Sequence, residues 1–352
     1  MKAAVLEDTG KIVLQDINIH PCGDEEVLIK AEATGICRTD MKCYTMGQRD
    51  LKLPRILGHE ITGTIEKVGP RVQSNISAGD RVQVFPGISC GNCNYCRLGL
   101  DNLCRDIKIM GFNHDGGFCE YILIPAKGVK NGILNKIPDN LTFKEASMTE
   151  PLACCINIQE ALKIQEEETV LILGGGRFGI LNAKLAKSLG AGKTFLIEPD
   201  LSRLKTAKNY EFDHLINLKK DRQDLAFNEI MKLTKEKGVD NVITCTPDPE
   251  ALDFGLKAAA NKGKIGFFSG IIPGPDGKDN IYINLIHYKE LYMVGSYGCS
   301  LGHSKKALEL FSSNEINVKD MITKTISLEN LESGLNMVKN KEELSMVVDF
   351  NL

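Results

Sequence analysis

The sequence has no hydrophobic run that approaches the about eighteen residues of a transmembrane helix, so we expect no membrane-spanning segment. Residues 1–15 lack the basic segment and apolar core of a signal peptide. No block of basic residues stands out, and 43 Lys and Arg against 46 Asp and Glu leave a net charge of −3, which gives no reason to expect binding to nucleic acid or anionic lipid. Internal repeats and low-complexity linkers are absent too. We therefore expect a soluble, cytoplasmic protein with a small-molecule partner.

Length and cysteine content narrow the class of protein further. At 352 residues the chain is long for one domain and sufficient for two, each with its own hydrophobic core. Twelve cysteines would suit a disulfide framework in a short secreted protein. In a chain of this length without a secretion signal, metal binding is the better explanation, and the spacing of the cysteines decides between the two.

A glycine-rich turn in the second half of the chain is the feature around which the sequence is organised. An apolar run over residues 170–173 ends in Gly174, Gly176 and Gly179, and a helical pattern follows. A second apolar run ends in Glu198, about twenty residues beyond the glycines. The glycine motif alone also occurs in purely structural turns. Strand, glycine turn, helix and distant acid together predict dinucleotide binding.

Several side chains near this turn are candidates for cofactor binding. The start of the helix, where Arg177 and Phe178 lie, would hold the pyrophosphate on its free amide groups. Glu198 could accept hydrogen bonds from both ribose hydroxyls of an adenosine, and its charge repels a 2′-phosphate. NAD is therefore favoured over NADP, while the nearby cation Arg203 keeps NADP as an alternative.

Four cysteines with close spacing predict a structural zinc site. Cys90, Cys93, Cys96 and Cys104 follow the pattern CxxCxxCx7C on a segment rich in Gly, Asn and Asp. Such a set can close a tetrahedron around one ion, and four thiolates leave no open coordination position. The first three cysteines also match the opening of a ferredoxin pattern, but the fourth spacing does not, so an iron–sulfur cluster and unligated thiols are the lesser alternatives.

The pattern of apolar residues divides the chain into three segments. Residues 1–150 contain short apolar runs broken by Gly, Pro, Asn and Asp, which predicts a largely β domain, with the metal lobe at 88–106. Residues 151–290 alternate strands with helices, which predicts a doubly wound parallel sheet and an α/β fold. We expect residues 291–352 to return to the first domain.

A second group of candidate metal ligands lies in the first segment. Cys37 stands in GICRTD, and His59 and Glu60 stand in GHE. Thiolate, imidazole and carboxylate suit zinc and leave a position for water or substrate. Taken alone, each is more often an ordinary core or surface residue. Glu150, in TEPLACC before an expected helix over residues 152–162, is by itself an ordinary first-turn carboxylate.

These motifs together resemble a known family. In their order and separations, GICRTD, GHE, the four-cysteine loop, EPLACC and GGGRFG resemble the zinc-containing medium-chain dehydrogenases of the alcohol dehydrogenase superfamily, over nearly the whole chain. Within the family the chain is similar to the polyol branch, which includes sorbitol (L-iditol) and galactitol-1-phosphate dehydrogenases, with threonine dehydrogenase a near relative. The resemblance implies a GroES-like catalytic domain, a Rossmann domain, hydride transfer in the cleft between them, and a homotetramer or homodimer.

The resemblance also implies roles in metal binding. Cys37, His59 and Glu60 would hold a catalytic zinc. Glu150 stands where alcohol dehydrogenases have a second Cys, and it would lie beside the metal or exchange with Glu60. The four clustered cysteines would hold a second, structural zinc, which gives two ions per chain.

Other residues next to Cys37 take their expected roles from the family. Thr39 matches the hydroxyl that passes the substrate proton outward, and Asp40 would support the zinc ligands. Arg38 replaces the Gly of many polyol enzymes and matches alcohol dehydrogenases in which this Arg binds the cofactor pyrophosphate. Lys42 replaces the relay His of threonine dehydrogenases, so the outer end of the proton path is left open.

The expected reaction is zinc-dependent hydride transfer between NAD and a secondary alcohol of a polyol or its ketose. A phosphorylated polyol is an alternative because Lys42, Arg49 and Lys52 follow the zinc cysteine, although a solvated surface run explains them as well. L-Threonine or a simple secondary alcohol is a further alternative. Relatives that bind nucleotide without turnover form another class, but they typically lack both sets of metal ligands.

Overall fold

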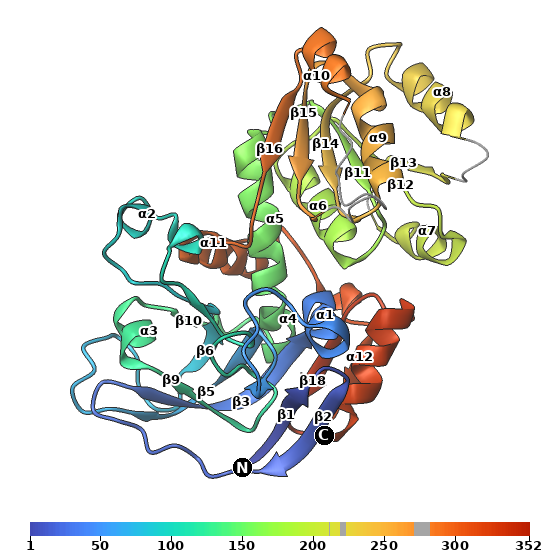
Figure 1. Ribbon diagram of the computed structural model, residues 1–352. Coiled ribbons are helices and arrows are strands. Elements are labelled where there is room, and N and C mark those ends of the chain that lie inside the picture. Colours follow the sequence, from blue (N-terminus) through green and yellow to red (C-terminus); the bar gives the residue numbers. More distant parts are fainter. Residues whose placement is uncertain (211, 219–222, 271–281) are drawn as a thin grey trace. The chain divides into compact units, whose positions relative to one another are not determined.

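The computed structural model describes residues 1–210, 212–218, 223–270 and 282–352 (Figure 1). Contacts divide the chain into two compact units. The first contains residues 1–153 and 299–352, and the second contains residues 154–298. The first unit is therefore built from two stretches of sequence.

The first unit is built on mainly antiparallel sheets, in which only β17 and β18 pair in parallel among the described strands. Its largest sheet has the order β10-β6-β5-β3-β18-β17, with β9 also paired to β3. The C-terminal strand β18 pairs with β3 so that Val347 lies opposite Gly35, which places this strand inside the sheet, between β3 and β17. The strands are β3 (Val27–Ile36), β5 (Glu60–Val68), β6 (Arg81–Val84), β9 (Tyr121–Ile124), β10 (Leu134–Lys136), β17 (Lys324–Ile326) and β18 (Met346–Asp349).

Two smaller sheets and a set of helices complete the first unit. The small sheets have the orders β2-β1-β4 and β7-β8, and the second of them carries the four-cysteine lobe between its strands. These strands are β1 (Lys2–Asp8), β2 (Lys11–Asp16), β4 (Arg55–Ile56), β7 (Gly87–Ile88) and β8 (Lys108–Ile109). The helices are α1 (Arg38–Met46), α2 (Asn94–Arg97), η1 (Asp101–Leu103), α3 (Ala126–Lys130), α4 (Phe143–Ser147), α11 (Leu301–Ser312), η3 (Lys319–Met321), η4 (Leu328–Asn330) and α12 (Leu331–Asn340), and α5 (Thr149–Leu162) contains the division between the units.

The second unit is a parallel sheet in the order β13-β12-β11-β14-β15-β16. In sequence order the strands read 3-2-1-4-5-6, which is the doubly wound order of dinucleotide-binding domains. The strands are β11 (Thr169–Leu173), β12 (Lys193–Ile197), β13 (His214–Ile216), β14 (Val239–Thr244), β15 (Ala259–Phe267) and β16 (Tyr292–Gly295). The helices that connect them are α6 (Arg177–Ser188), α7 (Leu201–Ala207), α8 (Gln223–Leu233), α9 (Pro249–Ala258) and α10 (Ile283–Lys289).

Alternate residues of the central strand β11 pack into two separate cores, one on each face of the sheet. Leu171 and Leu173 belong to the core that contains residues of α8 and α9, such as Ile230. Val170 and Ile172 belong to the core that contains residues of α5 and α6. Because neighbouring side chains of a strand point to opposite faces, an uninterrupted apolar run is what a strand buried on both faces requires.

The fold class is the predicted one, an α/β protein with a doubly wound parallel sheet and a discontinuous β-rich domain. Several element boundaries differ from the sequence-based expectation. Helix α1 was not predicted, and α5 begins at Thr149, so that it includes Glu150. Helix α9 ends at Ala258, although residues 259–263 continue its helical pattern. Residues after Ala258 instead begin β15, because they pair with β14. Over the described ranges, no helix is both long and apolar enough to cross a membrane.

Candidate active site and metal centres

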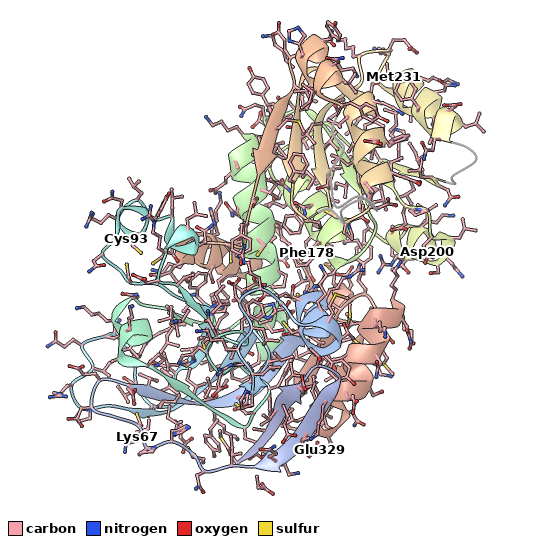
Figure 2. The ribbon with its side chains drawn as sticks, viewed as in Figure 1. Lys67, Cys93, Phe178, Asp200, Met231 and Glu329 are labelled. Carbon is pink, nitrogen blue, oxygen red and sulfur yellow. The ribbon has the colours of Figure 1, made fainter. Side chains whose placement is uncertain are left out.

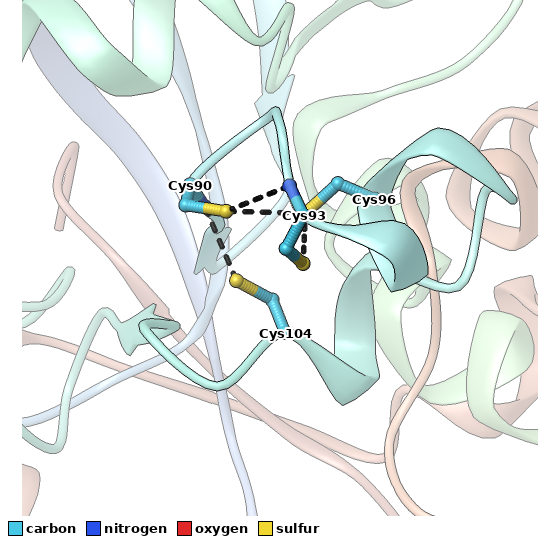
Figure 3. Close-up of side chains that lie close together, drawn as sticks. All are labelled: Cys90, Cys93, Cys96 and Cys104. Carbon is cyan, nitrogen blue, oxygen red and sulfur yellow. Dashed lines mark hydrogen bonds between the residues drawn. The ribbon is translucent and has the colours of Figure 1, made fainter.

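The four-cysteine lobe brings its thiols together as the spacing predicts (Figure 3). Sγ of Cys96 lies 3.5 Å from Sγ of Cys93 and 3.8 Å from Sγ of Cys90. Thiolates at about 2.3 Å from a tetrahedral zinc lie about 3.8 Å from one another, so these separations fit one ion at the centre. Backbone N–H groups also point at sulfur, since Cys93 donates to Cys90 and Cys90 donates to Cys104, each over 3.3 Å.

The surroundings of the lobe shift the pKa values of two of its thiols in opposite directions. The N–H groups of Asn92 and Cys93 lower the pKa of Cys90 to about 6, which favours the thiolate. Burial raises the pKa of Cys104 to about 12, which favours the thiol. A bound divalent cation removes this difference, because a coordinating thiol loses its proton. The donor set therefore fits a structural zinc.

A contact far apart in sequence connects this lobe to the C-terminal stretch of the same unit. Both carboxylate oxygens of Asp101 lie 3.2 Å from the backbone N–H of Leu301, the first residue of α11. An acidic side chain that accepts from a free N–H at a helix start stabilises that helix end. The lobe thus adds a contact to the start of α11, which Ser300 also caps.

The second group of candidate ligands, Cys37, His59 and Glu60, is also assembled by the fold. Cys37 follows the end of β3 and precedes α1, whereas Glu60 begins the neighbouring strand β5 directly after His59. One ligand atom from each side chain lies within 4.8 Å of the others, and all three residues are buried. Sulfur, nitrogen and oxygen donors at this separation can converge on one zinc and leave a position for a substrate oxygen.

Asp40 holds the two segments that carry these ligands. Its carboxylate accepts hydrogen bonds from the N–H of Cys37 over 2.8 Å and from the N–H of Gly58 over 3.2 Å. It also lies 3.2 Å from Nδ1 of His59, and among the described residues that nitrogen has no partner in regular hydrogen-bond geometry. Burial alone lowers the pKa of His59, but Asp40 and Cys37 outweigh it and raise this pKa well above its usual range. The same negative surroundings favour a bound cation.

The remaining residues predicted near the metal lie in α1 and α5. Arg38 and Thr39 form the first turn of α1, where Arg38 is exposed and Thr39 is half-buried. Glu150 lies in the first turn of α5 and is not part of the group formed by Cys37, His59 and Glu60. One of its carboxylate oxygens lies within 4.8 Å of the thiol of Cys299. The cation Lys42 is exposed on α1.

In the second unit, the glycine turn joins β11 to α6 in the way the motif predicts. Gly174 has φ = +106°, a conformation that favours glycine. A Cβ on Gly179 would lie 2.0 Å from the carbonyl oxygen of Gly174, so only glycine lets the helix pack this close to the strand. Phe178, labelled in Figure 2, lies in the first turn of α6. The centre of its ring lies 5.0 Å from that of the Phe268 ring. Arg177 is buried, and its guanidinium lies over the ring of Phe178.

Glu198 and Arg203 both lie beside this turn. The Glu198 carboxylate is buried and accepts hydrogen bonds from the N–H of Gly175 over 2.7 Å and of Asp200 over 2.9 Å. The Arg203 guanidinium lies 3.6 Å from the position that a Cβ on Gly176 would take. An acid and a cation therefore flank the glycine turn from the end of β12 and from α7.

Three relationships in the site could not be found from the sequence. Gly35 lies opposite Glu60 in the β3–β5 pair, Asp101 contacts Leu301, and Cys299 lies near Glu150. Each pair joins residues that are distant along the chain, so no local spacing signals it.

Comparisons with known proteins agree with this geometry. The chain matches an alcohol dehydrogenase GroES-like domain over residues 23–138 and a zinc-binding dehydrogenase domain over residues 178–313. It is 32% identical over 341 residues to the sorbitol dehydrogenase of Bacillus subtilis (strain 168), covering 95% of this chain and 92% of that protein. It is 34% identical over 314 residues to the L-threonine 3-dehydrogenase of Pyrococcus furiosus, covering 88% of this chain and 86% of that protein.

A solved structure is similar over almost the full length. It is that of a provisionally named zinc-binding dehydrogenase from Sinorhizobium meliloti 1021 bound to NADP, with a TM-score of 0.87, 30% identity, and coverage of 99% of this chain and 98% of that one. The match to a zinc-binding dehydrogenase domain and the cysteine cluster therefore support zinc and a nicotinamide as the cofactors. The chain belongs to the zinc-containing medium-chain dehydrogenases of the alcohol dehydrogenase superfamily, in the polyol branch.

Proposed function

We propose that the protein oxidises a secondary alcohol of an unphosphorylated polyol with NAD and reduces the corresponding ketose in the reverse direction. Sorbitol and L-iditol are the first candidates. The observation that carries the proposal is the buried group of Cys37, His59 and Glu60, with one thiol, one imidazole and one carboxylate within reach of a single ion.

The chemistry of these donors favours a polyhydroxylated substrate. A site with one thiolate and one or two carboxylates is harder and more anionic than a site with two thiolates and one imidazole. Hard donors suit a metal that also takes hydroxyl oxygens, and a polyol can offer two of them. The similarity to the B. subtilis sorbitol dehydrogenase supports the same substrate class.

The chain's own residues supply positioning and proton transfer. A zinc held by Cys37, His59 and Glu60 would act as a Lewis acid that lowers the pKa of the substrate hydroxyl. Thr39, two positions after Cys37 and half-buried, is the proposed acceptor of that proton. Glu150 is proposed as the carboxylate that lies beside the metal or exchanges with Glu60. The nicotinamide would accept the hydride.

The proposed preference for NAD depends on Glu198. Its carboxylate already lies on the glycine turn, where it can accept from ribose hydroxyls and repel a 2′-phosphate. Arg203 lies on the same turn and favours the opposite preference, and one similar structure holds NADP. The buried negative charge at the strand end supports NAD as the cofactor used. Arg38, an exposed cation at the start of α1, is proposed as a further contact to the pyrophosphate.

The deciding measurement is cofactor reduction by zinc-replete enzyme at mildly alkaline pH. The panel consists of sorbitol, L-iditol, xylitol, galactitol 1-phosphate, L-threonine and 2,3-butanediol, each with NAD and with NADP. Turnover confined to the free polyols with NAD supports the proposal. Metal analysis of the same preparation should give two zinc ions per chain, one of which is lost in Cys37→Ser. Turnover of L-threonine alone, or of a simple diol alone, would refute the polyol assignment.

A phosphorylated polyol is the second candidate. Lys42, Arg49 and Lys52 are all exposed, and a phosphate needs such cations. Arg49 already pairs with Asp50 over 3.2 Å, which reduces the charge available to a ligand. If only galactitol 1-phosphate reacts, Lys42→Ala and Lys52→Ala should raise KM for it and leave KM for NAD unchanged.

We also propose that the protein assembles as a homotetramer or homodimer. Within the second unit, β16 is the edge strand of the described sheet and Tyr292 on it is exposed, so this edge is the proposed contact. Light scattering coupled to size-exclusion chromatography gives the mass of the assembly and separates both states from a monomer.

A further inference from the structure

Gly35 makes room for the carboxylate of Glu60. The two residues lie directly opposite each other in the antiparallel pair of β3 and β5. A Cβ built on Gly35 would lie 2.0 Å from Oε2 of Glu60, 3.0 Å from its Cβ and 3.1 Å from its Cδ. The Glu60 side chain therefore occupies the space that a side chain at position 35 would take.

The obstacles around Gly35 differ in kind from those around a second glycine in the same strand pair. A Cβ on Gly63 would lie 2.3 Å from the carbonyl oxygen of Lys30, so a side chain there would force the sheet itself to move. The three nearest atoms to a Cβ on Gly35 all belong to Glu60. A methyl group at position 35 can therefore be accommodated if the Glu60 carboxylate swings away.

Little free space surrounds the Glu60 carboxylate, because the residue is buried. Glu60 is fully buried, and on its other side Gly35 pairs with Val347 of β18, so both residues lie inside the sheet. Glycine within a strand weakens it and often marks the close approach of another group. Here the group that approaches is one of the three donors that converge with Cys37 and His59.

We propose that Gly35 is a positioning residue for the catalytic metal. Its missing side chain holds open the space in which the Glu60 carboxylate lies next to Cys37 and His59. The oxygen donor of the site thus depends on a residue that does not touch the metal. This inference rests on the proposed function, which assigns a catalytic zinc to these three side chains.

The test is the metal affinity of Gly35→Ala, measured by competition with a chromophoric chelator and by the absorption spectrum of the cobalt(II)-substituted protein. We expect zinc affinity at the Cys37 site to fall by at least about tenfold, as when a group that orients a ligand is removed. The cobalt spectrum should change because one oxygen donor is displaced. The zinc of the four-cysteine lobe should remain bound. Gly302→Ala is the control, because a Cβ there meets only Oγ of Ser300 at 3.6 Å.

A double-mutant cycle with Glu60→Ala separates positioning from general damage to the sheet. If Gly35 acts through Glu60, Gly35→Ala should have no further effect on metal affinity once the carboxylate is gone. Wild-type affinity in Gly35→Ala, or an equal loss in the Glu60→Ala background, would overturn the inference. The proposed function is tested separately, by measuring zinc binding in the unsubstituted protein. If the wild-type Cys37 site binds no zinc at all, the proposed function is refuted.

Discussion

The carboxylate of Asp40 lies 3.2 Å from Nδ1 of His59. The same carboxylate accepts hydrogen bonds from the backbone N–H groups of Cys37 and Gly58. One buried side chain thus holds both chain segments that carry the candidate zinc ligands. A group that orients metal ligands in this way acts on metal affinity without touching the ion.

Asp40→Asn should weaken metal binding more than it weakens the fold. Asparagine keeps the size and one oxygen acceptor but removes the charge that attracts the imidazole and the cation. We expect zinc affinity at the Cys37 site to fall about 10- to 100-fold, measured by chelator competition. Thermal melting of the zinc-saturated protein is the control for folding. Unchanged affinity would show that the Asp40 charge does not contribute to metal binding.

Cys93→Ser should remove the structural zinc and lower stability. The lobe is held by four thiols rather than by a hydrophobic core, so metal binding supplies its folding free energy. We expect the zinc content to fall by one ion per chain and Tm to fall, with earlier proteolysis around the lobe. Cys22→Ser is the matched control, because this half-exposed cysteine lies outside both metal groups. Equal Tm values for the two variants would contradict the structural role.

Two substitutions at the glycine turn should shift cofactor preference in opposite directions. Glu198→Gln removes the charge that repels a 2′-phosphate, so kcat/KM for NADP relative to NAD should rise by about tenfold or more. Arg203→Ala removes a cation that lies beside Gly176, and the same ratio should fall. Steady-state kinetics with both cofactors at fixed polyol gives the ratio. A ratio unchanged in both variants would show that specificity lies elsewhere.

Glu168 should make stability depend on pH. Burial raises its pKa, but hydrogen bonds from Asn241, from the N–H of Gln165 and from Lys264 outweigh burial and lower the pKa below its usual value of 4.5. A carboxylate with a lowered folded pKa stabilises the fold above about pH 4.5 and loses this contribution as pH falls through the folded pKa. Urea unfolding of Glu168→Gln should show a smaller loss of stability below pH 4.5 than wild type. Glu166→Gln, at an exposed position nearby, should behave as wild type.

Leu171→Ala should destabilise the second unit by about 2–5 kcal/mol, because Leu171 is fully buried in the core that includes residues of α8 and α9. Chemical denaturation measures the loss. Leu201→Ala, at a position 61% exposed, should change the free energy of unfolding by less than about 0.5 kcal/mol. A similar loss in both variants would contradict the assignment of Leu171 to the core.

Features defined by short spacing were predictable from the sequence. These features are the glycine turn, the strands on either side of it and the four-cysteine lobe. Each depends on residues that are close together in the sequence, so the spacing of those residues predicts the local structure. The fold class followed from the alternation of strands and helices after Glu198. The group of Cys37, His59 and Glu60 was expected only through resemblance, because β3 and β5 must pair before Glu60 lies near Cys37.

Tertiary pairing decided what the sequence pattern could not. Residues 259–263 continue a helical pattern, but they lie in β15, where Ala259 pairs with Val239. Pairing outweighs local helix propensity, which is worth only a fraction of a kcal/mol per residue. The contact between Asp101 and Leu301 is of the same kind, since it depends on the return of the C-terminal stretch to the first unit.

The position of β18 between β3 and β17 has a consequence for biosynthesis. The ribosome completes β3 early, but it makes β18 only after the whole second unit has been synthesised. Until then β3 lacks the neighbour that Val347 and Val348 provide, and an unpaired strand edge is prone to wrong association. Docking of β18 beside the strand that leads into Cys37 is thus a late event for the nascent chain, so assembly of the candidate metal site at Cys37 should follow translation of β18.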